Sequence, residues 1–207
     1  MEADILLITH DHCDHNNVKA VSGSPFLISG PGEYEVKEVF IQGVPAFHDN
    51  SQGKERGQTT IYVIEAEDLR VCHLGDIGQK ELTSEQLEKI GEVDILMIPA
   101  GGVYTIDGKD ALKIMSQIEP KIIIPMHYSL PKLTLRQISG LQLRDSDSRR
   151  LMLSKAEALN PPAGGKLDDL DKFLKAAGIR KIEPLPKLTI KKKDLSEGEV
   201  KIVVLKP

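Results

Sequence analysis

The chain has 207 residues, of which 40% are hydrophobic and 28% charged, and its formal net charge is -4. This length and composition allow one domain with a substantial core, while the negative charge excludes a general attraction to nucleic acid. No apolar stretch is long enough to cross a membrane, the acidic start lacks the basic region of a secretory signal, and two cysteines are too few for a disulfide framework. We therefore expect one cytoplasmic domain over residues 1–207.

Seven short segments in the first two thirds of the chain predict strands. Most are apolar throughout and rich in Ile, Val and Leu, which is typical of strands covered on both faces. Helices are expected at 83–90, which opens with the capping sequence "TSEQ", and at 109–118, where apolar residues recur at helical spacing. This alternation predicts an α/β fold. The expected strands are 4–9, 25–29, 36–41, 59–65, 69–74, 94–98 and 121–125.

The texture of the sequence changes after residue 128. Residues 130–168 are polar and punctuated by Pro and Gly, which predicts a loop-rich, partly disordered insertion rather than a second core. A short helix is expected at 167–177, followed by strands at 188–192 and 200–205.

A dense group of titratable residues, "THDHCDHNN", follows the first predicted strand. Alternate side chains of an extended segment share a face, so His10 and His12 form a chelating pair. Asp14 and His15 come where the chain turns into an expected short helix, 14–20, and can reach a second point beyond the first. Imidazole nitrogens and carboxylate oxygens are ligands that zinc accepts, so the spacing suits two metal ions.

A lone histidine is usually a hydrogen-bonded core residue or a surface residue, and that alternative has to be weighed here. Packing three imidazoles and a carboxylate together without metal would leave buried polar groups unsatisfied, at about 1 to 3 kcal/mol each. The cluster therefore predicts metal binding.

The stretch "THDHCDH" resembles the His-x-His-x-Asp-His signature of the metallo-β-lactamase superfamily, and the resemblance continues in order along the chain. The family's next histidine corresponds to His48 in "VPAFHD". Its bridging aspartate corresponds to Asp76 in "VCHLGDIG", and its last histidine to His127 in "IIIPMHY".

This resemblance implies an αββα sandwich that holds two Zn²⁺ ions per chain, with Mn²⁺ or Fe²⁺ as alternatives. One ion would take His10, His12 and His48, and the other Asp14, His15 and His127. Asp76 would bridge the two ions, and Asp14 would also orient the attacking hydroxide, so the two aspartates are the expected catalytic residues.

Residues 1–130 resemble most the ascorbate-6-phosphate-lactonase-like branch of metal-dependent hydrolases, in "GPGEYEV", "HLGDIG", "DILMIPAGG" and "IIPMHY". The resemblance implies hydrolysis of a small, anionic ester, lactone or phosphoester. Di-iron members replace the second histidine of the motif by glutamate, so His12 favours hydrolysis over redox chemistry. Two alternatives stay open: a metal-binding or scaffold protein without turnover, and an RNA-processing nuclease. No basic RNA-docking arm is evident, so nucleic acid is not an expected partner.

Superfamily members place several strands before the signature, whereas nine residues precede His10 here. We therefore expect an incomplete first sheet, a chain truncated at its N-terminus, and pairing with a second copy as one way of covering the exposed edge. His73 is either a partner of the metal ligands or a structural residue. Tyr104, Thr105 and Tyr128 either line the site or pack, and Cys13 has no expected role.

Overall fold

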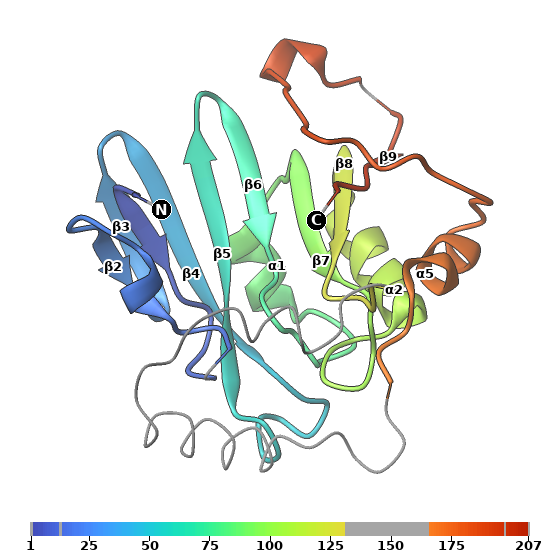
Figure 1. Cartoon of the computed structure of the whole chain (residues 1–207), viewed down its shortest axis with the longest axis horizontal. Coiled ribbons are helices and arrows are strands. Elements are labelled where there is room, and N and C mark those ends of the chain that lie inside the picture. Colours follow the sequence, from blue (N-terminus) through green and yellow to red (C-terminus); the bar gives the residue numbers. More distant parts are fainter. Residues whose placement is uncertain (1, 13, 131–165, 197, 207) are drawn as a thin grey trace.

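A mixed sheet forms the centre of the molecule in the computed structural model, which describes residues 2–12, 14–130, 166–196 and 198–206 (Figure 1). Seven strands of the described chain lie side by side in sequence order. They are β3 (Gly32–Val36), β4 (Val39–Phe47), β5 (Gln58–Ala66), β6 (Leu69–His73), β7 (Ile95–Pro99), β8 (Ile122–Met126) and β9 (Lys201–Ile202). A separate two-stranded parallel sheet contains β1 (Ile5–Leu7) and β2 (Phe26–Ile28).

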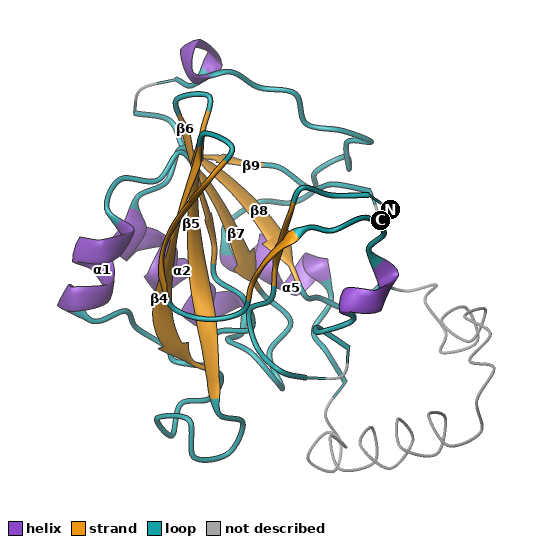
Figure 2. Cartoon of the chain, turned by 90° about the vertical axis from the view of Figure 1, so that its left-hand side faces the viewer, coloured by secondary structure: helices purple, strands orange, loops and turns teal. Residues whose placement is uncertain are grey.

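Helices cover one face of the large sheet, and Figure 2 shows α1 and α2 on the same side of it. Their bounds are α1 (Ser84–Ile90), α2 (Gly108–Ile118) and α5 (Leu170–Ala176). Side chains from β5 to β8, such as Val63 and Leu96, form one buried core with Ile114 of α2 and Phe173 of α5. The expected cap of α1 is confirmed, because the Thr83 side chain accepts a hydrogen bond from the Gln86 backbone N–H.

The opposite face of the large sheet is covered in two parts. The small sheet packs Ile28 of β2 against Ile41 and Tyr62, and the C-terminal segment packs residues such as Val203 against Ile122. The Tyr62 hydroxyl donates a 2.8 Å hydrogen bond to the Ile8 carbonyl, and burial raises the pKa of this hydroxyl to about 12. This bond ties the large sheet to the backbone just before His10.

The α/β prediction is confirmed, and most expected strands and helices are present within a few residues. The expected strand 36–41 is wrong, since it spans the hairpin between β3 and β4, whose turn residues Lys37 and Glu38 adopt positive φ angles of 50° and 63°. The expected strand 188–192 is also wrong, since the segment ends in the 3-10 helix η2 (Lys192–Asp194).

The remaining differences concern the expected short elements. Of the helix 14–20, only the 3-10 helix η1 (Val18–Ala20) forms, and the strand 200–205 is reduced to β9. Most of the expected insertion, 131–165, and Cys13 lie outside the described residues. Within the described part of the chain, no helix is both long and apolar enough to cross a membrane.

Asp94, at the opposite edge of the sheet from the histidines, anchors the C-terminal segment. Its side chain is 4% exposed and accepts hydrogen bonds from Lys192 Nζ at 2.7 Å, Lys121 Nζ at 3.2 Å and the Arg70 backbone N–H at 3.0 Å. Burial alone would raise the pKa of Asp94, but these bonds outweigh burial and hold the pKa below its ordinary value.

We expect Asp94→Asn to lower the free energy of unfolding at pH 7 by about 1 to 3 kcal/mol, because the charged acceptor of two lysines is lost. The pKa of Asp94 in the folded protein lies below its value of about 3.9 in the unfolded chain. The ionised carboxylate therefore stabilises the folded state above that pH, and this stabilisation is lost as the pH falls through the pKa of the folded protein. Urea unfolding from pH 7 down to pH 3 should therefore show the two proteins converging. Asp68→Asn, at an exposed turn, is the matched control. A difference that stays constant with pH would contradict the prediction.

Candidate metal centre

The direction of the strands brings distant residues to one edge of the large sheet. Strand β5 is antiparallel to both β4 and β6, and β6, β7 and β8 are parallel to one another. The carboxyl ends of β4, β6 and β8 therefore lie at the same edge. His48, Asp76 and His127 each follow one of these strands, so the topology alone predicts that they meet.

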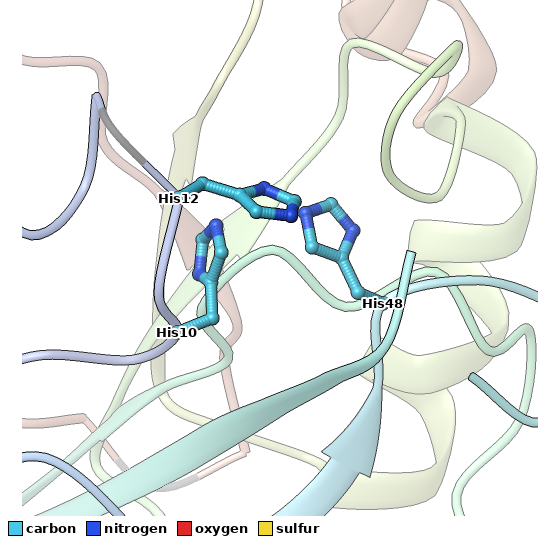
Figure 3. Close-up of side chains that lie close together, drawn as sticks. All are labelled: His10, His12 and His48. Carbon is cyan, nitrogen blue, oxygen red and sulfur yellow. The ribbon is translucent and has the colours of Figure 1, made fainter. Parts of the chain in front are cut away.

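Three histidines converge at this edge, as Figure 3 shows for His10, His12 and His48. Each offers a ring nitrogen within 4.8 Å of the others. The ring centroid of His10 lies 4.5 Å from that of His12 and 4.8 Å from that of His48. Three imidazoles at such spacing can hold one metal ion between them.

Asp76 lies at the centre of the cluster with a side chain only 8% exposed. Its Oδ2 atom is 3.3 Å from Nε2 of His127, 3.5 Å from that of His15, 3.7 Å from that of His48 and 3.9 Å from that of His10. Burial would raise the pKa of Asp76, but the hydrogen bond from His127 and the neighbouring imidazoles hold it far below its ordinary value. The group is thus a carboxylate at any ordinary pH.

Asp14 stands at the outer rim of the same cluster. Its side chain is 69% exposed, and its Oδ2 atom lies 3.6 Å from Nε2 of His15. The structure thus brings all seven residues expected from the sequence into one group. Their assignment to two separate ions stays a prediction.

The donor atoms fit metal ions. Among the described residues, Nε2 of His10 is a buried ring nitrogen that faces Asp76 and has no hydrogen-bond partner; the Nδ1 atoms of His48 and His127 also lack one, and their Nε2 atoms face the carboxylate. The other ring nitrogen of His10 lies 2.9 Å from Thr9 Oγ1, which fixes the ring with Nε2 toward Asp76. Burial lowers the pKa of His10 to about 4, so its imidazole is neutral at pH 7, as a metal ligand must be. An ion here would supply the missing partner of Nε2.

Glycines allow the loops that carry these residues to approach closely. A Cβ atom on Gly78 would lie 2.4 Å from the carbonyl oxygen of His48, and one on Gly101 would lie 2.1 Å from that of His127. The Gly78 N–H also donates to the Phe47 carbonyl at 2.9 Å. The segments that follow β4 and β6 are therefore packed backbone against backbone.

Two buried glutamines that were not predicted as part of the site support the centre. The Gln79 side chain accepts from the Phe47 N–H at 3.0 Å, and the Gln86 side chain donates to the Pro45 carbonyl at 2.8 Å. Both bonds hold the end of β4, from which His48 follows. Their nearest sequence signal was the capping position of Gln86, which says nothing of this second contact.

His73 has a local partner in the structure. Its Nδ1 accepts a 3.0 Å hydrogen bond from the Gly75 N–H, within the turn that leads to Asp76, and burial lowers its pKa. No hydrogen bond between His73 and the predicted ligands is present among the described residues. The structural interpretation of this histidine is therefore favoured.

The histidines and aspartates lie where the parallel strands of a mixed sheet end, and helices cover one face of that sheet. This arrangement defines an α/β metalloprotein of the metallohydrolase type. Residues 1–127 match the family model described as the beta-lactamase superfamily domain. The chain therefore belongs to the metallo-β-lactamase superfamily, and the fold class expected from the sequence is confirmed.

Relatives over most of the chain carry similar descriptions. A UPF0173 metal-dependent hydrolase of Pyrococcus horikoshii is 27% identical over 190 residues, which cover 80% of this chain and 81% of the relative. One of Thermococcus onnurineus is 31% identical over 153 residues, or 62% and 68% of the two chains. A solved structure from Thermotoga maritima, described as a candidate zinc-dependent hydrolase of the metallo-β-lactamase superfamily, is 30% identical with a TM-score of 0.69, covering 99% of this chain and 84% of that one.

Proposed function

We propose that this metal-dependent hydrolase uses two zinc ions to hydrolyse a small ester, lactone or phosphoester. The observation that carries the proposal is the position of Asp76, whose single Oδ2 atom lies 3.3 to 3.9 Å from four imidazoles. A carboxylate so placed can be shared by two ions. The names of the UPF0173 relatives and of the Thermotoga maritima structure support hydrolysis and zinc.

The residues divide into two sets of nitrogen and oxygen donors. His10, His12 and His48 would hold one ion. Asp14, His15 and His127 would hold the other, with Asp76 between them. Bound there, zinc supplies Lewis acidity for a carbonyl or phosphoryl oxygen and lowers the pKa of water toward neutrality.

The chain's own side chains then set the direction of attack. The Asp14 carboxylate, which is exposed at the rim, would accept a hydrogen bond from the attacking water and orient it toward the substrate. The buried Asp76 stays ionised and balances the positive charge of the centre. The low pKa of His10 keeps its imidazole ring neutral, so that a ring nitrogen can donate its lone pair to a metal ion.

The test is to measure metal content and hydrolysis on the same preparation. Mass spectrometry of the purified protein should find two equivalents of zinc, with manganese or iron as the alternatives, and the loaded protein should hydrolyse at least one class in a panel of lactones, thioesters and phosphoesters. Chelation should abolish turnover, and zinc should restore it. Metal bound without any turnover would favour the scaffold alternative, and cleavage of single-stranded RNA would favour the nuclease.

A further inference from the structure

The loop that follows His48 is held by one buried carboxylate. Asp49, 6% exposed, accepts four backbone hydrogen bonds of 2.7 to 3.1 Å. Burial alone would raise the pKa of Asp49, but these bonds lower it, so the carboxylate is charged and committed to the loop. Residues 50–57 therefore have a defined conformation beside the predicted metal ligand. The donors are the N–H groups of Ser51, Gly53, Glu55 and Arg56.

This loop places Arg56 next to the centre. The carbonyl of the following residue, Gly57, accepts a 3.1 Å hydrogen bond from the His48 N–H, and β5 then starts at the same edge of the sheet. The backbone of Arg56, a permanent cation, is therefore one residue away from a direct hydrogen bond to a predicted ligand.

An aromatic ring from a second loop holds the guanidinium. The Arg56 Cζ atom lies 4.7 Å from the centre of the Tyr104 ring, within the range of a cation–π contact. The Tyr104 loop is tied to the centre on two sides: the Ile106 N–H donates to the Ile77 carbonyl at 3.0 Å, and the Ala100 N–H to the Met126 carbonyl at 3.1 Å. Those acceptors are direct neighbours of Asp76 and His127. The Arg56–Tyr104 pair therefore connects the two sides of the cluster.

The charge of Arg56 is not neutralised by a described neighbour. Over the described ranges, no carboxylate lies within ion-pair distance of its guanidinium. The two nearest acidic residues in sequence are engaged elsewhere, Asp49 by the loop backbone and Glu55 by the Ser51 hydroxyl at 2.8 Å. A planar guanidinium that lacks an ion-pair partner among the described residues, and that lies beside a predicted hydrolytic centre, is suited to binding a carboxylate or phosphate oxyanion.

We propose that Arg56, held over Tyr104, determines substrate specificity by binding an oxyanion group, carboxylate or phosphate, of the molecule hydrolysed at the His/Asp cluster. The proposal rests on the proposed function and deepens it, since it derives an anionic substrate from a named side chain. Sequence similarity had only implied such a substrate.

Matched substrates test this specificity. Para-nitrophenyl hemisuccinate and para-nitrophenyl butyrate share a leaving group and differ in a terminal carboxylate. Arg56→Gln should reduce kcat/KM for the hemisuccinate by about 10- to 100-fold, mainly through KM, because a charged hydrogen bond is lost. The butyrate should change by less than about 3-fold, and Arg56→Lys should fall between Gln and the wild type because it keeps the charge without the planar fork. Equal losses on both esters, or none on either, would overturn the proposal.

A binding measurement separates this proposal from the proposed function. Calorimetric titration of the zinc-loaded protein with inorganic phosphate should give a dissociation constant about 10-fold higher for Arg56→Gln than for the wild type. Lys54→Gln removes one charge from an exposed position of the same loop and is the matched control; it should match the wild type in both assays. Equal melting temperatures and zinc contents show that each variant is folded.

The outcomes are distinct. If no ester is hydrolysed yet phosphate binding depends on Arg56, the proposed function fails and the oxyanion site stands. If esters are hydrolysed but phosphate binding and ester preference are the same without Arg56, the function stands and the oxyanion site is refuted.

Discussion

Replacing Asp76 by asparagine should reduce turnover by about 1000-fold or more, the scale expected when metal-assisted charge stabilisation of several kcal/mol is lost. An amide has the shape of the carboxylate but no negative charge, and its NH2 group donates hydrogen bonds where the carboxylate has an oxygen that accepts them. The variant therefore cannot serve as the shared anionic ligand that the proposed function requires. Zinc content, measured by mass spectrometry after dialysis, should fall below two equivalents per chain.

The control for this variant is Asp68→Asn, the same chemical change at the exposed turn between β5 and β6. Asparagine tolerates the positive φ of 63° at that position, so stability, zinc content and turnover should all be unchanged. If the Asp76 variant kept two zinc ions and full activity, the reaction would belong to other residues than those identified here.

The predicted ligands could be selected from the sequence because four of them lie within six consecutive positions, His10 to His15. No single-sequence argument from spacing could have joined His48, Asp76 and His127 to them, because these residues are far apart in the chain. Resemblance supplied them, and the structure provides the physical reason. Each follows a strand of the same direction, and parallel strands end at one edge.

The errors in the fold have local causes. Apolar residues flank the β3–β4 turn so closely that 36–41 resembled one strand, and the turn itself, Lys37–Glu38, has neither glycine nor asparagine to mark its positive φ angles. The segment 188–192 has a strand-like apolar pattern. Its Leu188 and Ile190, however, pack their side chains onto the face of the sheet, and the segment does not pair with an outer strand. Near its end, Lys192 is held by a distant residue, Asp94, which no local pattern reports.

The functional role of loop residues was the hardest feature to predict from the sequence. Arg56 stands in "NSQGKERGQ", a stretch that is indistinguishable by composition from a solvated turn. Its environment is set by Asp49, seven residues earlier, and by Tyr104 from another loop. The nearest sequence signal was the aspartate directly after His48, since aspartate often caps the backbone of a following turn.

Gly78 tests whether the close packing of loops positions the centre. A Cβ atom there would meet three backbone atoms of the neighbouring loop: the His48 carbonyl oxygen at 2.4 Å, the His48 carbonyl carbon at 2.6 Å and the Asp49 Cα at 2.6 Å. Backbone atoms cannot rotate away as a side chain can, so the two loops must separate. Gly78→Ala should therefore lower the free energy of unfolding by about 1 to 3 kcal/mol, the usual cost of overpacking.

Moving His48 should cost more in turnover than in stability. A displacement of about 1 Å at a catalytic centre can reduce the rate about 100-fold, so we expect Gly78→Ala to lose turnover on that scale and to bind zinc more weakly. Gly30→Ala is the matched control, because a Cβ atom on Gly30 would meet nothing within 4 Å. Urea unfolding, zinc titration and kinetics on both variants check the result. If Gly78→Ala behaved like Gly30→Ala, the segment after β6 would not hold His48 in place, and the position of this imidazole would depend on the Asp49 loop alone.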